Sequence, residues 1–243
     1  MVLKAKGDLI LSGHSESAGG SFIKVEINGH GALHGDVECK NFECNGSAKI
    51  NGNITAHHAA INGSTKVQGN FSSEVMEIHG DLTIDGTAFF RKMEIKGHTR
   101  VKKTIKGDDI LLDGIIKVAG DCEVEKAELN GAFTIDGLLN ADHVEISLHG
   151  KSTVKEIGGE VITVSRNRQP ILHLDKLIKA LRRELHANII EGDVVKLEYT
   201  RARVVRGNSV EIGPGCEIEF IEYSSNLKVS EKALVKKSEK TLK

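Results

Sequence analysis

Apolar and polar residues alternate with a period of two along most of the chain, which is typical of β-strands. The segment 25–41 contains three short runs of this kind. Their alternating members are Val25 and Ile27, then Gly31 and Leu33, then Val37 and Cys39. Asn28-Gly29 and His34-Gly35 separate the runs and are typical turn dipeptides. The segment therefore predicts three short strands that together form one turn of a three-sided coil.

Glycine recurs in phase with these strands. The first series repeats every 17 residues and consists of Gly29, Gly46, Gly63, Gly80, Gly97, Gly114 and Gly131. The second series lies six residues later at Gly35, Gly52, Gly69, Gly86, Gly120 and Gly137, and Lys103 interrupts it. A fixed period of this length indicates a solenoid. We expect the glycines at the corners, where their tolerance of positive φ is useful.

Successive units place apolar residues in three inward columns. These contain Ile27, Cys44, Ile61, Ile78, Ile95, Leu112, Leu129 and Ile146; Leu33, Ile50, Val67, Ile84, Val101, Val118 and Ile135; and Val37, Ile54, Phe71, Ala88, Ile105, Cys122 and Leu139. An isolated coil buries almost no surface, so such strands are stable only when they stack. The sequence predicts an all-β, three-sided parallel β-helix of 17-residue coils, with the right-handed crossovers that parallel strands prefer.

Charged residues form outward columns. One face carries Glu26, Glu43, Glu77, Glu94, Glu128 and Glu145, and another carries Lys49, Lys66, Arg100 and Lys117. Stacked carboxylates repel one another. We expect this repulsion to be offset by the corner residues Lys24, Lys92, Lys126 and His143. The two faces could bundle laterally through opposite charge, but solvated faces with neighbouring countercharges are favoured because exposed ion pairs contribute little.

The repeat divides the chain into five segments. Residues 1–7 form a short N-terminal tail, 8–164 the β-helix, 165–188 a loop with an inserted amphipathic helix, 189–223 C-terminal β-helix coils, and 224–243 a basic tail. The basic tail has six lysines and two glutamates, a composition that predicts mobility. The N-terminus lacks the apolar core of a signal peptide, which favours a cytoplasmic location.

The inserted helix is predicted over Ile171 to His186, directly after Pro170. Its apolar stripe could dock on the solenoid, or the helix could lie on anionic lipid with its basic residues at the headgroups. Its modest length and small net charge favour docking. The candidate residues for this lateral or membrane contact are Leu174, Lys176, Lys179, Arg182 and Arg183.

Composition argues against several kinds of binding site. A formal net charge of −1 disfavours a nucleic-acid-binding face along the whole chain, and 4% aromatic residues leave few platforms for bases or sugars. Three cysteines at inward positions and a fourth of less regular phase are expected to be small core residues: Cys39, Cys44, Cys122 and Cys216. His57, His58 and His79 lack metal-ligand spacing. We therefore expect no metal, no cofactor and no nucleic-acid partner.

Two classes of β-solenoid enzyme provide alternatives. Hexapeptide acyltransferases repeat every six residues, whereas these coils divide into strands of six, six and five. Polysaccharide-active enzymes need clustered carboxylates within an enclosing pocket. The short loops here do not provide one, so we expect no catalytic residues. A monomeric binding module remains a further alternative.

Six segments carry a family resemblance. They are Ile27-Asn28-Gly29, Gly35-Asp36-Val37, Cys44-Asn45-Gly46, Ile50-Asn51-Gly52-Asn53-Ile54, Gly137-Leu138-Leu139-Asn140-Ala141 and Ile212-Gly213-Pro214-Gly215-Cys216. On these segments the chain resembles the bactofilins, polymer-forming bacterial cytoskeletal proteins, and in particular their longer form from Bacillus-like bacteria. The resemblance extends over nearly the whole chain. It implies a right-handed β-helix that joins end to end into nucleotide-free filaments and serves cell shape, stalks or motility.

The resemblance also implies partners and a location. Homo-polymers are expected, together with other cytoskeletal or membrane-associated bacterial proteins. Many bactofilins bind the inner face of the cell membrane through an apolar N-terminal tail, for which only Met1-Val2-Leu3 is available here.

A β-helix has open strand edges at both ends, and these can accept further strands. The resulting polymer-interface candidates are Leu9, Ile10, Leu11, Ile218, Phe220 and Tyr223.

Overall fold

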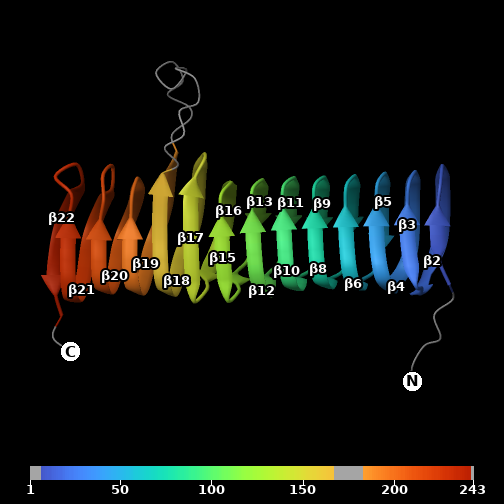
Figure 1. Cartoon of the computed structure of the whole chain (residues 1–243), viewed down its shortest axis with the longest axis horizontal. Helices are drawn as coiled ribbons and strands as arrows, with labels where there is room; N and C mark the ends of the chain where they lie inside the picture. The colour runs from blue at the N-terminus through green and yellow to red at the C-terminus, as the bar shows by residue number, and fades with distance from the viewer. Residues whose placement is uncertain (1–6, 167–182, 242–243) are drawn as a thin grey trace, which may run out of the picture. The chain divides into compact units, whose positions relative to one another are not determined.

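The computed structural model describes residues 7–166 and 183–241 of the chain. By contacts the chain divides into two compact units, Met1–Gly120 and Asp121–Lys243. Every described element is a β-strand, and all the registered strand pairs within each unit are parallel, as Figure 1 shows for neighbouring strands such as β6 and β8. Each unit is therefore a parallel β-solenoid, as the period-two alternation predicted.

The described part of the first unit, residues 7–120, contains thirteen strands. They are β1 (Leu9–Leu11), β2 (His14–Ser21), β3 (Lys24–Ile27), β4 (His30–Cys44), β5 (Ser47–Asn51), β6 (Ile54–Ile61), β7 (Ser64–Val67), β8 (Phe71–Ile78), β9 (Asp81–Ile84), β10 (Ala88–Ile95), β11 (His98–Val101), β12 (Ile105–Leu112) and β13 (Ile115–Val118).

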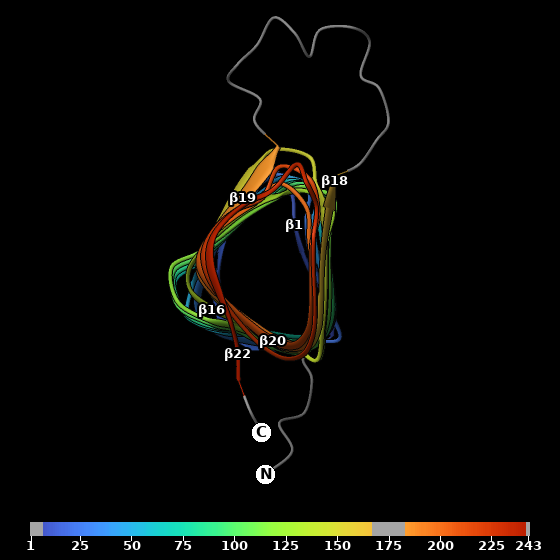
Figure 2. The same ribbon diagram turned by 90° about the vertical axis from the view of Figure 1, so that its left-hand side faces the viewer.

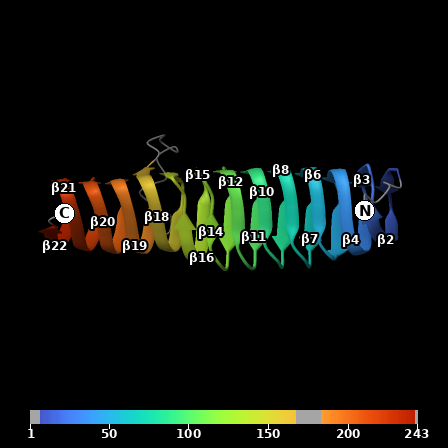
Figure 3. The ribbon, with the colours of Figure 1, turned by 90° about the horizontal axis from the view of Figure 1, so that it is seen from below.

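Within residues 121–166 and 183–241, the second unit contains nine strands. They are β14 (Cys122–Glu123), β15 (Lys126–Leu129), β16 (Ala132–Asn140), β17 (His143–Leu148), β18 (Lys151–Arg166), β19 (Glu184–Leu197), β20 (Thr200–Ile212), β21 (Glu217–Val229) and β22 (Leu234–Lys240). Strands β18 to β21 pair in sequence order and lie side by side (Figure 3).

Three parallel faces make up each turn of the first unit. The first face contains β1, β3 and the C-terminal parts of β4, β6, β8, β10 and β12. The second face contains the start of β2 and of β4, together with β5, β7, β9, β11 and β13. The third face contains the end of β2, the middle of β4 and the N-terminal parts of β6, β8, β10 and β12. Figure 2 looks along the coils and shows the chain passing around their interior.

The predicted inward columns form the core. Ile78, Ile84 and Phe71, one from each column, are fully buried, and the other members of all three columns are at most 2% exposed. The hydrophobic effect therefore acts along each stack, because every coil covers the apolar side chains of its neighbours.

The first glycine series, Gly29 to Gly131, is called the glycine comb below, and it has a different structural cause from the one predicted. None of its seven members is among the described residues with positive φ. Instead, a Cβ on Gly63 would lie 1.9 Å from the carbonyl oxygen of Gly46, and the same overlap recurs at Gly80 and Gly97. Glycine is required because successive corners approach too closely for any side chain. The expectation of positive φ was wrong for these positions.

Coil length is constant only in part of the chain. Ile54 pairs with Phe71 at an offset of 17 residues, but Thr134 pairs with Thr153 and Leu185 with Thr200. The offsets in the second unit thus range from 15 to 19, apart from 33 between β18 and β19, so a uniform 17-residue coil does not extend through it.

Two predicted segments differ from the structure. Most of the helix over Ile171 to His186 lies outside the described residues, but its last three residues begin β19, where Leu185 is buried. The mobile tail predicted from residue 224 is wrong, because β21 continues to Val229 and β22 pairs with it in parallel. Backbone pairing orders this segment although most of its side chains are exposed.

Candidate polymer interface

The N-terminal edge of the first unit is formed by β1 and β2. Leu9 pairs with Val25 and Leu11 with Ile27, while β2 pairs with β4. Among residues 7–166, no registered strand pairs with the other side of β1 or β2. Leu11 is buried, whereas Ile10 is 58% exposed. The three predicted residues therefore lie on a strand edge, but Ile10 faces outward with Glu26 rather than along the coil interior.

The interior of this first coil is partly polar. Ser15 and Ser17 pair with Gly31 and Leu33, so two hydroxyls occupy inward positions. The column of Ser17 is apolar further along the stack, whereas that of Ser15 also contains the buried Thr65 and Thr99. The Ser15 hydroxyl donates to the carbonyl oxygen of Ser12 at 2.8 Å. This coil therefore presents hydroxyls beside the apolar side chains of β1.

The C-terminal candidates lie one coil inside the edge. Ile218 pairs with Val235, Phe220 with Lys237 and Tyr223 with Lys240, so β22 covers all three. Ile218 is only 2% exposed. The Lys237 ammonium lies 5.0 Å from the centre of the Phe220 ring. Placing these residues at the terminal surface was wrong, because the lysine-rich segment after them adds one more strand.

Other apolar residues occupy the last coil. Leu227 pairs with Val210 and Val229 with Ile212, and no registered strand among residues 183–241 covers their other side. Val229 is 42% exposed and Leu234 is 61% exposed. Leu227 and Val229 alternate with other residues and follow Val210 and Ile212 by one coil. This repeated alternation was the sequence signal for this surface.

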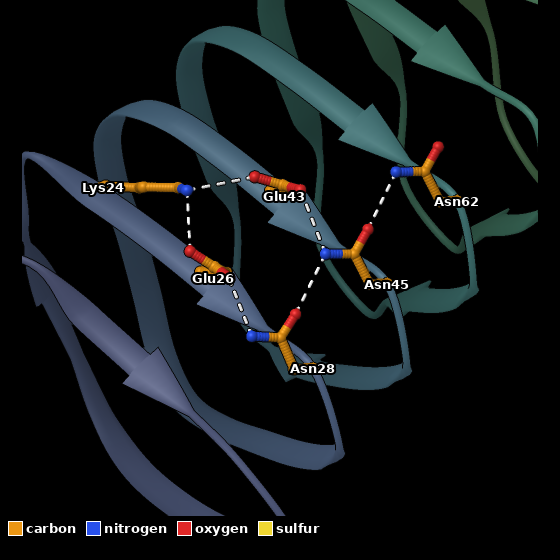
Figure 4. Close-up of polar contacts among 6 residues, drawn as sticks. All are labelled: Lys24, Glu26, Asn28, Glu43, Asn45 and Asn62. Atoms are coloured by element: carbon orange, nitrogen blue, oxygen red, sulfur yellow. Dashed lines mark hydrogen bonds and ion pairs between the residues drawn. The ribbon is translucent and has the colours of Figure 1, made fainter.

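A polar ladder runs along the first face and is drawn in Figure 4. The Asn62 side-chain amide donates to Asn45 at 2.8 Å, and that of Asn45 donates to Asn28 at 3.0 Å. Lys24 lies 2.7 Å from Glu26 and 3.1 Å from Glu43. These contacts join successive coils by hydrogen bonds, which adds to the backbone pairing.

The ladder also offsets the charge of the predicted glutamate column. The hydrogen bond from Lys24, followed by that from Asn28, lowers the pKa of Glu26. Hydrogen bonds from Asn45 and then Lys24 lower the pKa of Glu43. The expected compensation by Lys24 is therefore confirmed, and asparagine contributes to it as well.

A second ladder was missed from the sequence. The Asp36 carboxylate accepts from the backbone N–H of Asn53 at 2.7 Å. The side-chain oxygen of Asn53 accepts from the N–H of Asn70, and that of Asn70 from the N–H of Thr87. The available signal was an aspartate or asparagine directly after four glycines of the second series, Gly35, Gly52, Gly69 and Gly120.

The cysteines are core residues. All four are buried and free. Burial is the main cause that raises the pKa of the Cys122 thiol to about 12, with a smaller contribution from Glu123. Burial is also the main cause that raises the pKa of the Cys39 thiol to about 12 and that of the Cys216 thiol to about 11. Protonated, buried thiols are poor nucleophiles and metal ligands.

His57 and His58 lie beside carboxylates in the first unit. His57 lies 3.4 Å from Glu74, and His58 lies 3.4 Å from Glu77. Within the described part of the chain, no group of three or more histidine, cysteine, aspartate or glutamate residues is placed to hold a metal ion.

The candidates for lateral or membrane contact lie largely outside the described residues. This applies to Leu174, Lys176, Lys179 and Arg182, whereas Arg183 directly precedes β19. No helix long and apolar enough to cross a membrane occurs in residues 7–166 or 183–241.

Comparison with known proteins identifies the family. The chain is 45% identical over 233 residues to the uncharacterized protein YhbE of Bacillus subtilis (strain 168), covering 96% of this chain and 97% of that protein. The sequence profile described as "Bactofilin: Polymer-forming cytoskeletal" matches residues 2–89. The chain belongs to the bactofilin family.

A further relative matches this bactofilin over about a third of its length. The uncharacterized protein YhbF of Bacillus subtilis (strain 168) is 47% identical over 88 residues, which is 36% of this chain and 34% of that protein. No solved structure matches the chain. The family description is that of a structural, polymer-forming cytoskeletal protein, so the terminal coils are the surfaces of greatest interest.

Proposed function

We propose that this bactofilin assembles end to end into filaments without nucleotide and acts as a cytoplasmic scaffold. The filaments would support cell shape, motility or the local recruitment of other proteins. A peripheral position at the inner face of the cell membrane is part of the same proposal.

The observation that supports assembly most directly is the uncovered apolar layer of the last coil. Leu227 and Val229 continue inward columns whose preceding members, Val210 and Ile212, are fully buried. A coil from another copy would bury them as each internal coil buries its neighbour. Burial of apolar surface drives such association.

The terminal strands provide the second part of the contact. The backbone groups on the outer edges of β1 and β22 pair with no registered strand among the described residues. An unpaired strand edge of this kind accepts a further strand. Monomeric solenoids cover such edges with polar or helical caps. Strand addition supplies backbone hydrogen bonds, and the apolar layer supplies buried area.

Negative-stain electron microscopy of the purified full chain, without nucleotide, tests the proposal. We expect filaments at micromolar concentration. Val229→Lys should abolish them, because it places a charge in the buried layer. Ile115→Lys is the matched control, since Ile115 is similarly exposed at 46% but lies on β13 rather than on a terminal coil. A monomeric wild type, or equal loss of filaments in both variants, would contradict end-to-end assembly.

A further inference from the structure

The third face of the first unit combines a hollow with an exposed aromatic ring. Its outward column crosses six coils and contains Ser21, Glu38, Thr55, Ser72, Phe89 and Lys106. Thr55 and Ser72 are short, and together with Ser21, Glu38 and Phe89 they line a shallow hollow. Phe89 is 39% exposed. The exposed ring and the adjoining hollow are complementary features of one face.

We propose that this column is a self-complementary contact between two copies of the chain. The first units would pack face to face with antiparallel coil axes, related by a two-fold axis at Ser72. Successive coils are equally spaced, so this axis places Phe89 of each copy over Thr55 of the other. The ring of one copy then fills the hollow of its partner. An isologous arrangement of this kind is the commonest way for identical chains to associate.

The charges of the same column favour this register. Glu38 lies two coils from Ser72 on one side, and Lys106 lies two coils from Ser72 on the other side. The two-fold axis therefore brings Glu38 of each copy opposite Lys106 of the other. Parallel packing would instead set Glu38 against Glu38 and Lys106 against Lys106, which is repulsive.

The neighbouring corner column obeys the same symmetry. It contains Lys40, His57, Glu74, Arg91 and Asp108, the residues at which the paired strands bend from the third face to the first. An axis through the coil of Ser72 and Glu74 brings Lys40 opposite Asp108 of the second copy. The two Glu74 carboxylates meet at the axis, where His57 and Arg91 flank them. His57 is already 3.4 Å from Glu74 within one copy.

The contact uses one narrow face, so its area lies below that of a standard stable interface. An isolated pair is therefore weakly bound. If copies are aligned in filaments, as the proposed function holds, the contact repeats and its strength multiplies by avidity. The contact thus accounts for lateral pairing of filaments, a step separate from their elongation.

Cross-linking with a short bis-maleimide tests the contact in the full chain. Ser72→Cys places a thiol on the two-fold axis, and the four native cysteines are buried, so background is low. We expect Ser72→Cys to give covalent dimers. Thr83→Cys is the matched control, because Thr83 is similarly half-buried but faces outward from β9 on the second face. Equal yields from the two variants overturn the proposal.

Charge exchange in the Ser72→Cys background tests the antiparallel register. Glu38→Lys or Lys106→Glu alone should reduce the yield by roughly fivefold or more, because each places like charges opposite one another. The double exchange should restore it. Failure of the double exchange to restore cross-linking contradicts the register.

Electron microscopy of the same samples separates this contact from elongation. Filaments without Ser72→Cys cross-links overturn the lateral contact and leave end-to-end assembly standing. Cross-links without filaments support the lateral contact and contradict the proposed function.

Discussion

The two units are built on the same kind of buried column but differ in how regularly their coils repeat. In the first unit, β6, β8, β10 and β12 pair at a constant offset of 17 residues. In the second, Leu185 pairs with Thr200, Thr134 with Thr153, and Cys122 with Leu139. Ile78 and Ile190 are nevertheless both fully buried. The stacked apolar core, rather than a fixed coil length, therefore maintains the solenoid.

A constant number of residues in each coil has a separate consequence for the surface. Where every coil has 17 residues, identical side chains recur at the same corner and form ladders such as Asn28, Asn45 and Asn62. The last coils of the second unit are instead joined by ion pairs, including Lys228 with Glu211 and Lys236 with Glu219. Repetition at 17 residues thus supports amide ladders in the first unit and charged pairs in the last coils of the second.

The largest expected effect is common to both units. Ile78→Ala and Ile190→Ala each remove a fully buried side chain. Each should lower the local free energy of unfolding by about 2–5 kcal/mol, measured from amide hydrogen exchange in its own unit. A large loss in one unit with none in the other would contradict a shared basis of stability.

The next effect distinguishes the units. Gly63→Ala places a Cβ 1.9 Å from the Gly46 carbonyl oxygen, whereas a Cβ on Gly150, at the corresponding turn of the second unit, meets only Ala132 at 3.7 Å. Gly63→Ala should cost about 1–3 kcal/mol, and Gly150→Ala should stay within about 0.5 kcal/mol. Urea unfolding followed by hydrogen exchange compares them. Equal costs would show that close approach is not the reason for the comb.

A smaller effect is expected from the ladder. Asn45→Ala removes its bonds with Asn28, Asn62 and Glu43. We expect a loss of about 1 kcal/mol, observed as faster amide exchange in β4 and β5. Asn41→Ala serves as the control, because Asn41 lies on β4, four residues before Asn45, and is also exposed; it should leave exchange unchanged.

Acid should lower the stability of the last coils more than that of the coils joined by the amide ladder. The hydrogen bond from Lys228 lowers the pKa of Glu211. Its stabilising contribution is therefore present above the unfolded carboxyl pKa and is lost as pH falls through the folded value. After correction for intrinsic exchange, amides of β21 and β22 should lose protection in acid before those of β5 and β7. Simultaneous loss would contradict the contrast between charges and amides.

Much of the fold could be predicted because its signals are periodic. The alternation around Ile27, Leu33 and Val37 located the three faces, and all the predicted inward positions are buried. The reason for the glycine comb could not be read from sequence, since positive φ and close approach both select glycine. Gly46 and Gly63 show that the distance between coils decides.

The interface was harder to predict than the core. Lys236, Lys237 and Lys240 gave the last strand the composition of a mobile tail, which hid the backbone pairing of β22 with β21. Ile218 was consequently placed at the surface although β22 covers it. Composition describes side chains, whereas an edge strand is held mainly by its backbone.

The central claim is that the terminal coils are the assembly surface. Hydrogen–deuterium exchange of wild-type filaments, compared with the unassembled Val229→Lys variant, tests it most directly. If the terminal coils form the contact, assembly protects the amides of β1 and β22, while those of β9 and β20 exchange equally in both samples. Equal exchange of β1 and β22 in filaments and in the unassembled variant would contradict it.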